Sequence, residues 1–275
     1  MLDIQLTGNA MQMAIVRLQP GQVVYSEAGK FLFSSADVQM ETRFGQPSGS
    51  APPAGGGGAL GGLLRGAVDA GKRMLAGESL ALCHFSSPGG DGLLALAGVL
   101  PGEMQVLELD GTRTWFAEKD AFVAAEAGVN FDIAFSGLRQ GFSGGEGFVL
   151  EKFTGRGSLL IAGAGNFIEV NPADHGGTLK VDTGCVVAWD DRISYGIERV
   201  GALNRQGIVN AVFGGEGFNL ATLRGDGRVI LQSMTITGLA GALAKAAEHS
   251  RDSRSGNTNG ATGLGSLGGI FGNSG

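Results

Sequence analysis

Reactive and metal-binding side chains are scarce in this 275-residue sequence. It holds two cysteines, Cys83 and Cys185, and three histidines, His84, His175 and His249. None of them stands at the spacing of a zinc site, and two cysteines do not make a disulfide framework. A Gly-x-Ser-x-Gly nucleophile elbow and a phosphate-binding P-loop are also missing. The sequence therefore nominates no catalytic residue, no metal site and no cofactor, and we predict that the protein is not an enzyme.

An excess of positive charge and long apolar runs are missing as well. Lys and Arg number 20 against 26 Asp and Glu, a net charge of −6, so binding to nucleic acid by bulk charge is not expected. Aromatic residues are 7% of the chain, too few and too scattered for a base-stacking platform. No apolar run approaches the roughly 18 residues of a membrane span. Because the first residues also lack the basic start and apolar run of a signal peptide, we expect a cytoplasmic protein.

Three related stretches organise the chain. Gly144–Ile161 (GGEGFVLEKFTGRGSLLI) returns as Gly214–Leu231 (GGEGFNLATLRGDGRVIL), and a looser copy occupies Ala76–Leu96. In each copy apolar residues alternate, then step by three, then follow a glycine-rich segment. Alternation predicts a strand with one buried face, the step of three predicts a β-bulge, and the glycines predict a hairpin turn. We therefore predict three hairpin modules around one core.

Each module contains a glutamate at the same point. These residues are Glu78, Glu146 and Glu216. We expect each carboxylate to accept hydrogen bonds from nearby backbone N–H groups and so to fix the start of a strand. The alternative is that the three converge on a cation or ligand, which close like charges would oppose unless something neutralised them.

A second pattern precedes each module. It reads as a turn, a short alternating strand, an acidic residue and then a β-branched or aromatic run, such as Phe31–Phe33 in the first unit. The acidic residues aligned in this way are Glu27, Glu108 and Asp182. The same structural role is expected for them.

The domain organisation follows from these repeats. We predict a single β domain over residues 1–238, with repeats at about 1–97, 98–165 and 166–238. A Gly/Pro-rich insertion at 45–62 interrupts the first repeat, a short helix follows at 60–75, a second short helix spans 239–249, and residues 250–275 form a flexible Gly/Ser-rich tail.

The helix at 60–75 is amphipathic. Leu60, Leu63 and Leu64 fall on its apolar stripe, and Lys72 and Arg73 fall on the opposite face. Such a helix is suited to packing on the β core or on another subunit. The alternative is contact with a membrane surface through its cationic face.

Several stretches resemble one known family. They are GNAMQMAIVRLQPGQVVYSEAGKFLFSS, LAGESLALCHF, LPGEMQVLELDG, FSGGEGFVLEKFTGRGSLLIAGAG, LKVDTGCVVAW and FGGEGFNLATLRGDGRVILQS. In this order they cover most of residues 4–245 and are similar to the altered-inheritance-of-mitochondria family, once a domain of unknown function. Its fold is grouped with the tryptophan RNA-binding attenuation protein, in the TRAP-like superfamily. The resemblance implies an all-β fold of the double-stranded β-helix type and homo-oligomers, and its mitochondrial members are linked to inner-membrane organisation.

The combined prediction is an all-β protein whose antiparallel sheets form a TRAP-like sandwich of three repeats, plus two short amphipathic helices. A β-prism is the alternative arrangement. For function we predict a self-associating scaffold or binding protein, as a homo-oligomer of three or more copies. The alternatives are a module that binds a small ligand or RNA, and a protein that organises a membrane surface.

Overall fold

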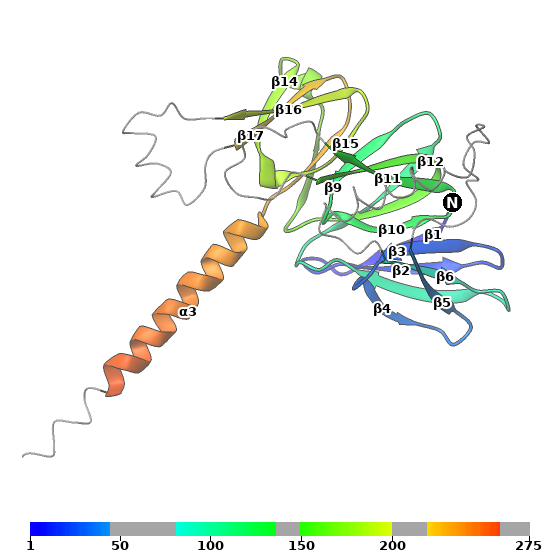
Figure 1. Ribbon diagram of the computed structural model, residues 1–275, viewed down its shortest axis with the longest axis horizontal. Helices are drawn as coiled ribbons and strands as arrows, with labels where there is room; N and C mark the ends of the chain where they lie inside the picture. The colour runs from blue at the N-terminus through cyan, green and yellow to red at the C-terminus, as the bar shows by residue number, and fades with distance from the viewer. Residues whose placement is uncertain (45–80, 136–148, 200–218, 259–275) are drawn as a thin grey trace, which may run out of the picture. The chain divides into compact units, whose positions relative to one another are not determined.

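The computed structural model describes residues 1–44, 81–135, 149–199 and 219–258 (Figure 1). The chain divides into two compact parts, the β part Met1–Ser233 and the C-terminal part Met234–Gly275. The predicted insertion at 45–62 and the predicted helix at 60–75 lie outside the described residues.

The β part is built from β-strands, and the all-β class is confirmed. Its first strands are β1 (Asp3–Thr7), β2 (Met13–Leu18), β3 (Val23–Glu27), β4 (Phe31–Ser34), β5 (Gln39–Phe44), β6 (Ala81–Ser86) and β7 (Gly92–Ala97). The middle of the chain gives β8 (Met104–Asp110), β9 (Trp115–Glu118), β10 (Phe122–Glu126), β11 (Val129–Phe135) and β12 (Val149–Ala162). The last strands are β13 (Phe167–Val170), β14 (Thr178–Asp182), β15 (Val186–Asp190), β16 (Ile193–Arg199), β17 (Asn219–Gly225) and β18 (Val229–Gln232), with 3-10 turns at Pro172–His175 and Thr183–Cys185.

One antiparallel pairing scheme occurs three times along the chain. Each occurrence is called a unit below: the first contains β2–β7, the middle one β8–β12 and the third β13–β18. Strand β7 pairs with β2 and β4, while β6 pairs with β3 and β5. Strand β18 likewise pairs with β13 and β15, while β17 pairs with β14 and β16. In the middle of the chain, the single long strand β12 corresponds to both β6 and β7. Its C-terminal half pairs with β8 and β10, and its N-terminal half pairs with β9 and β11. Strands β4, β10 and β15 are therefore equivalent, as are β3, β9 and β14.

The predicted hairpins are wrong. The glycine-rich segments bend a strand instead of reversing it, because β12 runs through Gly155 and Gly157 without a break. Both glycines have positive φ, 96° and 140°, and so has Gly225 at the end of β17, at 133°. Strands β6 and β7 lie in different sheets, and so do β17 and β18, whereas both halves of β12 lie in the 11-stranded sheet. In all three cases each half is hydrogen-bonded to other neighbours on both sides. No edge is left for the halves to pair with each other.

The predicted β-bulge lies in another strand. The register of β12 against β11 and β9 is unbroken through Leu150 and Phe153. Their spacing of three places them in different core clusters, on opposite faces of a strand that is covered on both sides, which makes apolar residues on both faces favourable. The register shifts that do recur lie in β4, β10 and β15, for example between Phe31 and Phe33.

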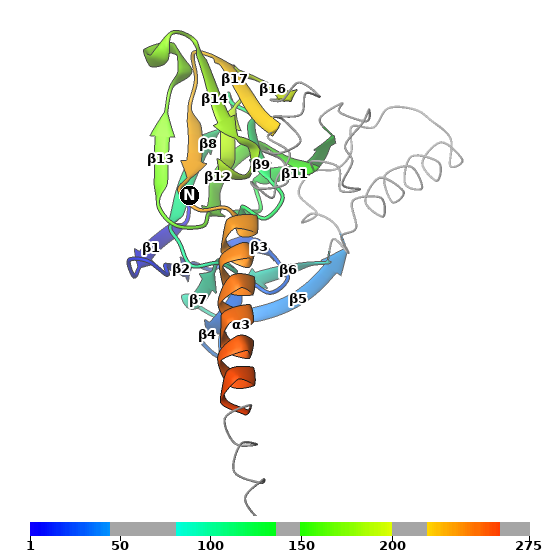
Figure 2. The same ribbon diagram turned by 90° about the vertical axis from the view of Figure 1, so that its left-hand side faces the viewer.

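Neighbouring units are joined by two strand pairs. Strand β10 pairs with β3 of the preceding unit, and β15 pairs with β9 of the preceding unit. Half of one unit thus completes a sheet with half of the next, and the strands form the continuous order β13-β18-β15-β9-β12-β10-β3-β6-β5. The strands β1-β2-β7-β4 and β14-β17-β16 remain as two separate sheets (Figure 2).

Three clusters of apolar side chains fill the space between the sheets. In one of them Phe122 contacts Phe131 and Phe153, with ring centroids 5.7 and 5.2 Å apart. Tyr25 joins this group and is fully buried, and its hydroxyl donates a 2.8 Å hydrogen bond to the Val129 carbonyl. Because burial of aromatic rings removes much apolar surface from water, this cluster is a main source of stability where the first two units meet.

The C-terminal part contains helix α3 (Ile236–Thr258). The helix is longer than the predicted 239–249 and continues into the predicted tail. It begins earlier because the Thr235 hydroxyl accepts a 3.0 Å hydrogen bond from the Gly238 N–H group, a typical N-cap. Leu243 of this helix is 63% exposed. Nothing in the structure explains the extension at the C-terminal end.

Candidate functional site

The residues predicted as possible site or interface residues lie outside the described part of the chain. These are the module glutamates Glu78, Glu146 and Glu216, and Leu60, Leu63, Leu64, Lys72 and Arg73 of the predicted helix. Their roles stay predictions. The candidate sites below are built from the residues that the structure describes.

The second acidic set is partly corrected. Glu27 and Asp182 end the equivalent strands β3 and β14, but the residue at this position of β9 is Glu118 and not Glu108, which lies on β8. The middle unit has two turn-and-strand segments that end in an acidic residue, and only strand pairing tells them apart. Asp182 accepts a 2.9 Å hydrogen bond from the Gly184 N–H group, and Glu118 accepts one of 3.2 Å from Asp120. Both carboxylates therefore fix the turn that follows the strand.

A further set of equivalent polar residues was not predicted. Ser35, Glu126 and Asp190 stand at or just after the ends of β4, β10 and β15. Each accepts a hydrogen bond from a backbone N–H group in the strand paired with it: Leu93 to Ser35 at 3.0 Å, Ser158 to Glu126 at 3.1 Å and Arg228 to Asp190 at 3.2 Å. The three acceptors differ in chemistry, so no sequence motif marks them. Their shared role is to hold two strands together.

Asp190 is the most heavily bonded of these acceptors. Its side chain is 3% exposed, and it forms an ion pair with Arg192 at 2.8 Å. Burial alone would raise its pKa, but hydrogen bonds from the Arg192 side chain and from the N–H groups of Arg228 and Arg192 outweigh burial, so the pKa lies below its ordinary value. The guanidinium of Arg228 lies over the Trp115 ring at 5.0 Å and binds both oxygens of Glu169. This network joins the second and third units.

Buried polar side chains also occur in the first two units. His84 and Tyr25 face each other on β6 and β3, with ring centroids 6.1 Å apart. Glu151 on β12 is 1% exposed. Burial, and then the charge of Glu151, raise the pKa of the Tyr25 hydroxyl far above its ordinary value. Tyr25 therefore stays neutral and donates its hydrogen bond to the Val129 carbonyl.

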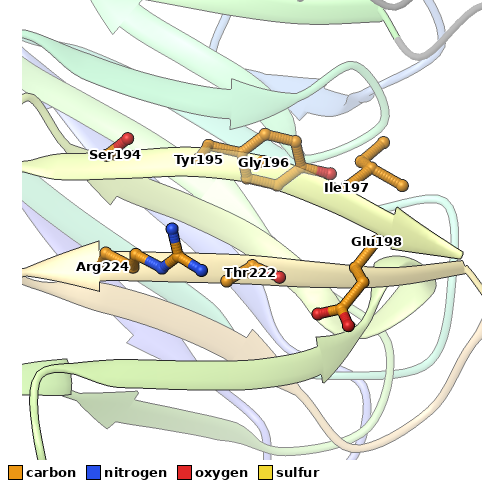
Figure 3. A pocket seen from close by; sticks show the side chains of 7 residues that line it. All are labelled: Ser194, Tyr195, Gly196, Ile197, Glu198, Thr222 and Arg224. Atoms are coloured by element: carbon orange, nitrogen blue, oxygen red, sulfur yellow. The ribbon is translucent and has the colours of Figure 1, made fainter. Parts of the chain in front are cut away.

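A hollow of about 280 Å³ lies on β16 and β17. Gly196 has no side chain and its cross-strand partner Thr222 has a short one, so the space between them stays open (Figure 3). Arg224 lies toward one end of the hollow and Glu198 toward the other, and Lys180 of β14 forms a 2.8 Å ion pair with Glu198. The opposite charges compensate each other here. This hollow therefore lacks the run of one charge that a polyanion such as RNA needs.

Three consecutive apolar residues are exposed on β4. Phe31, Leu32 and Phe33 are 40%, 49% and 47% exposed. The equivalent residues of β10 and β15, identified by the recurring register shift, are at most 3% exposed: Phe122, Val123, Ala124, Val186, Val187 and Ala188. Unlike β4, β10 and β15 each also pair with a strand of the preceding unit, starting at Ala124 and Ala188. In the described part of the chain, β4 pairs with β7 and with no strand of another unit.

Two further features of the described residues bear on the other predicted functions. Within the ranges that the structure describes, no group of three or more His, Cys, Asp and Glu side chains is placed to hold a metal ion. Among those same residues, no helix combines the length and the apolar character needed to cross a membrane.

Comparison with known proteins places this fold in a family. The model of the mitochondrial biogenesis AIM24 family matches residues 4–234, which is nearly all of the β part, Met1–Ser233. The chain belongs to this family. The membership of this family that the sequence resemblance indicated is thereby confirmed.

Two proteins of Streptococcus pyogenes are similar to this chain over most of their length. An uncharacterized protein of serotype M6 is 30% identical over 238 residues, which are 85% of this chain and 87% of the relative. A protein of the same species, solved by X-ray crystallography, has a TM-score of 0.65 and 25% sequence identity, over 90% of this chain and 100% of the other. The solved structure shares the fold of this chain.

Proposed function

We propose that this AIM24-family chain is a non-enzymatic β scaffold that associates with itself into homo-oligomers of three or more copies. The exposed apolar run Phe31–Phe33 carries the proposal. A run of this kind on an edge strand is a template for pairing with another chain, and proteins normally shield it with charge, proline or a covering element. The equivalent strands β10 and β15 bury the same positions against a neighbouring unit.

The polar clusters support a structural role for the chemistry that is present. Asp190, Glu126 and Ser35 hold strands together, and Asp182 and Glu118 fix turns. Nucleophilic catalysis needs a nucleophile, a base and an orienting group within hydrogen-bond reach. The hydrogen bonds of these residues go mainly to backbone N–H groups and to an arginine, which suits a framework and not a reaction centre.

Light scattering coupled to size-exclusion chromatography tests the proposal. The chain has a mass of 28.0 kDa, and we expect a discrete species of three or more times this mass at micromolar concentration. Since the proposed contact is mainly apolar, the mass should not fall when the ionic strength rises about tenfold, whereas an association held by surface ion pairs would weaken. A monomer at all concentrations would contradict the proposed function.

A further inference from the structure

Two sheets, β1-β2-β7-β4 and β14-β17-β16, are called the end sheets here, and each offers one of the two strands that form the junctions between units. Inside the chain, a complete sheet forms where β15 meets β9 and again where β10 meets β3. In the described part of the chain, β4 and β14 each pair with one strand only, at the ends of β1-β2-β7-β4 and β14-β17-β16. Strand β4 is equivalent to β10 and β15, and β14 is equivalent to β3 and β9. Each end sheet therefore carries one side of the same junction.

The two internal junctions share one register. Ala124 pairs with Ser26 in the first, and Ala188 pairs with Ala117 in the second. These residues are equivalent to Phe33 on β4 and Val181 on β14, because β4, β10 and β15 share a register shift and the position of Val181 follows from its pairing with Ala221. The same register applied to the end strands places Phe33 opposite Val181, Ser34 opposite Lys180 and Ser35 opposite Leu179.

We propose that β4 of one copy pairs antiparallel with β14 of a second copy in this register. The proposal rests on the self-association proposed above and specifies its surface. It continues a junction that the chain already forms twice, and it covers Phe31, Leu32 and Phe33 on one side and the half-buried Leu179 and Val181 on the other. Both ribbon views draw β4 and β14 apart in one chain (Figures 1 and 2), so the second half comes from another copy.

The side chains make this junction different from the internal ones at one point. Phe33 and Val181 are larger than the alanine and serine residues that meet inside the chain. The junction between copies therefore packs a wider apolar layer around the same main-chain pairing. Because each copy offers one β4 and one β14, the contact is head-to-tail, and it closes into a ring when the last free β14 meets the first free β4.

Disulfide trapping tests the proposed register. Residues that face each other in antiparallel strands have Cα atoms about 4.5–5.5 Å apart, within the range that a disulfide spans. In a background with Cys83→Ala and Cys185→Ala, the double variant Phe33→Cys/Val181→Cys should give reducible dimers and higher species on mild oxidation. A mixture of the two single variants should stop at dimers, because each chain then carries one reactive edge.

Control variants test whether the strands pair in the proposed register and through β4. Phe33→Cys with Lys180→Cys is shifted by one residue, which turns the second thiol to the other face of the strand, so it should not cross-link. Phe33→Lys introduces a charge at the junction on a side chain that is exposed in the single chain, and it should weaken self-association at least tenfold. Ile168→Lys alters a side chain that is 58% exposed on β13 and should leave the oligomer intact.

The outcomes separate this inference from the proposed function. Oligomers without a Phe33–Val181 cross-link, or oligomers that Phe33→Lys leaves unchanged, would overturn the inference while self-association stands. A disulfide that forms inside one chain would show that the halves close on themselves and would also overturn it. Monomers in light scattering would contradict both. Circular dichroism of every variant checks that each one is folded before association is compared.

Discussion

Gly225 lies at the bend between β17 and β18, where a side chain has no room. Its φ is 133°, and a Cβ atom there would lie 2.2 Å from the Arg192 carbonyl oxygen. The equivalent Gly155 in β12 would meet the Gly128 carbonyl at 2.3 Å. Both contacts are with backbone atoms, which cannot turn away as a flexible side chain can. The bends thus depend on glycine for the dihedral angle and for the close approach.

We predict that Gly225→Ala lowers the free energy of unfolding by about 2 kcal/mol or more, since strain at a positive φ adds to a backbone clash. Gly89→Ala is the control: a Cβ atom at Gly89 meets nothing within 4 Å, so the change should stay within about 0.5 kcal/mol. Urea unfolding followed by circular dichroism measures both. Equal stabilities of the two variants would contradict the account of the bend.

Asp190 offers a second test at the scale of the residue. Asp190→Asn removes the charge that accepts hydrogen bonds from Arg192 and Arg228, and should lower the free energy of unfolding at pH 7 by about 2 kcal/mol. The pKa of Asp190 is lowered in the folded protein. Its contribution is therefore present above the unfolded-state value of about 4 and is lost as the pH falls through the folded-state value.

The difference in stability between wild type and Asp190→Asn should be constant near neutral pH and shrink below about pH 4. Urea unfolding at several pH values measures this. Asp3→Asn is the matched control, since Asp3 is exposed and its nearest cation, Arg17, is 3.8 Å away; surface pairs of this kind contribute about 0–1 kcal/mol. A gap that stays constant down to pH 3 would show that the charge of Asp190 is not what matters.

At the scale of the element, alternation located most strands, but local patterns could not decide how they connect. Glycines at Gly155 and Gly157 signal positive φ, and positive φ serves a hairpin turn and a bend between two sheets equally well. The choice depends on whether the halves already have neighbours, which is a property of the whole fold. The exchange of Glu108 for Glu118 has the same origin, because two similar segments follow each other in the middle unit.

The run Phe31–Phe33 shows a further limit of sequence reasoning. It is an apolar run like the equivalent runs in β10 and β15. The runs in β10 and β15, strands that also pair with the preceding unit, are buried, whereas Phe31–Phe33 is exposed on β4, which pairs with β7 alone in the described residues. The run alone therefore does not decide its burial. The module glutamates Glu78, Glu146 and Glu216 stay predictions, since they lie outside the described residues.

For the whole molecule, the row of three units ends in two open strands that match each other. An open apolar edge favours association with other chains unless it is covered. The solved Streptococcus pyogenes protein shares the fold along 90% of this chain. The central claim is that the end sheets complete each other between copies.

Hydrogen exchange of backbone amides tests this claim most directly, because edge amides that gain a partner strand become protected. Exchange measured by mass spectrometry above and below the association range should show peptides covering β4 and β14 protected together at high concentration. Both should lose protection on dilution, while β10 and β15 stay protected throughout. If β4 and β14 exchange equally fast at every concentration, although the protein is oligomeric, the copies associate elsewhere and the account is wrong.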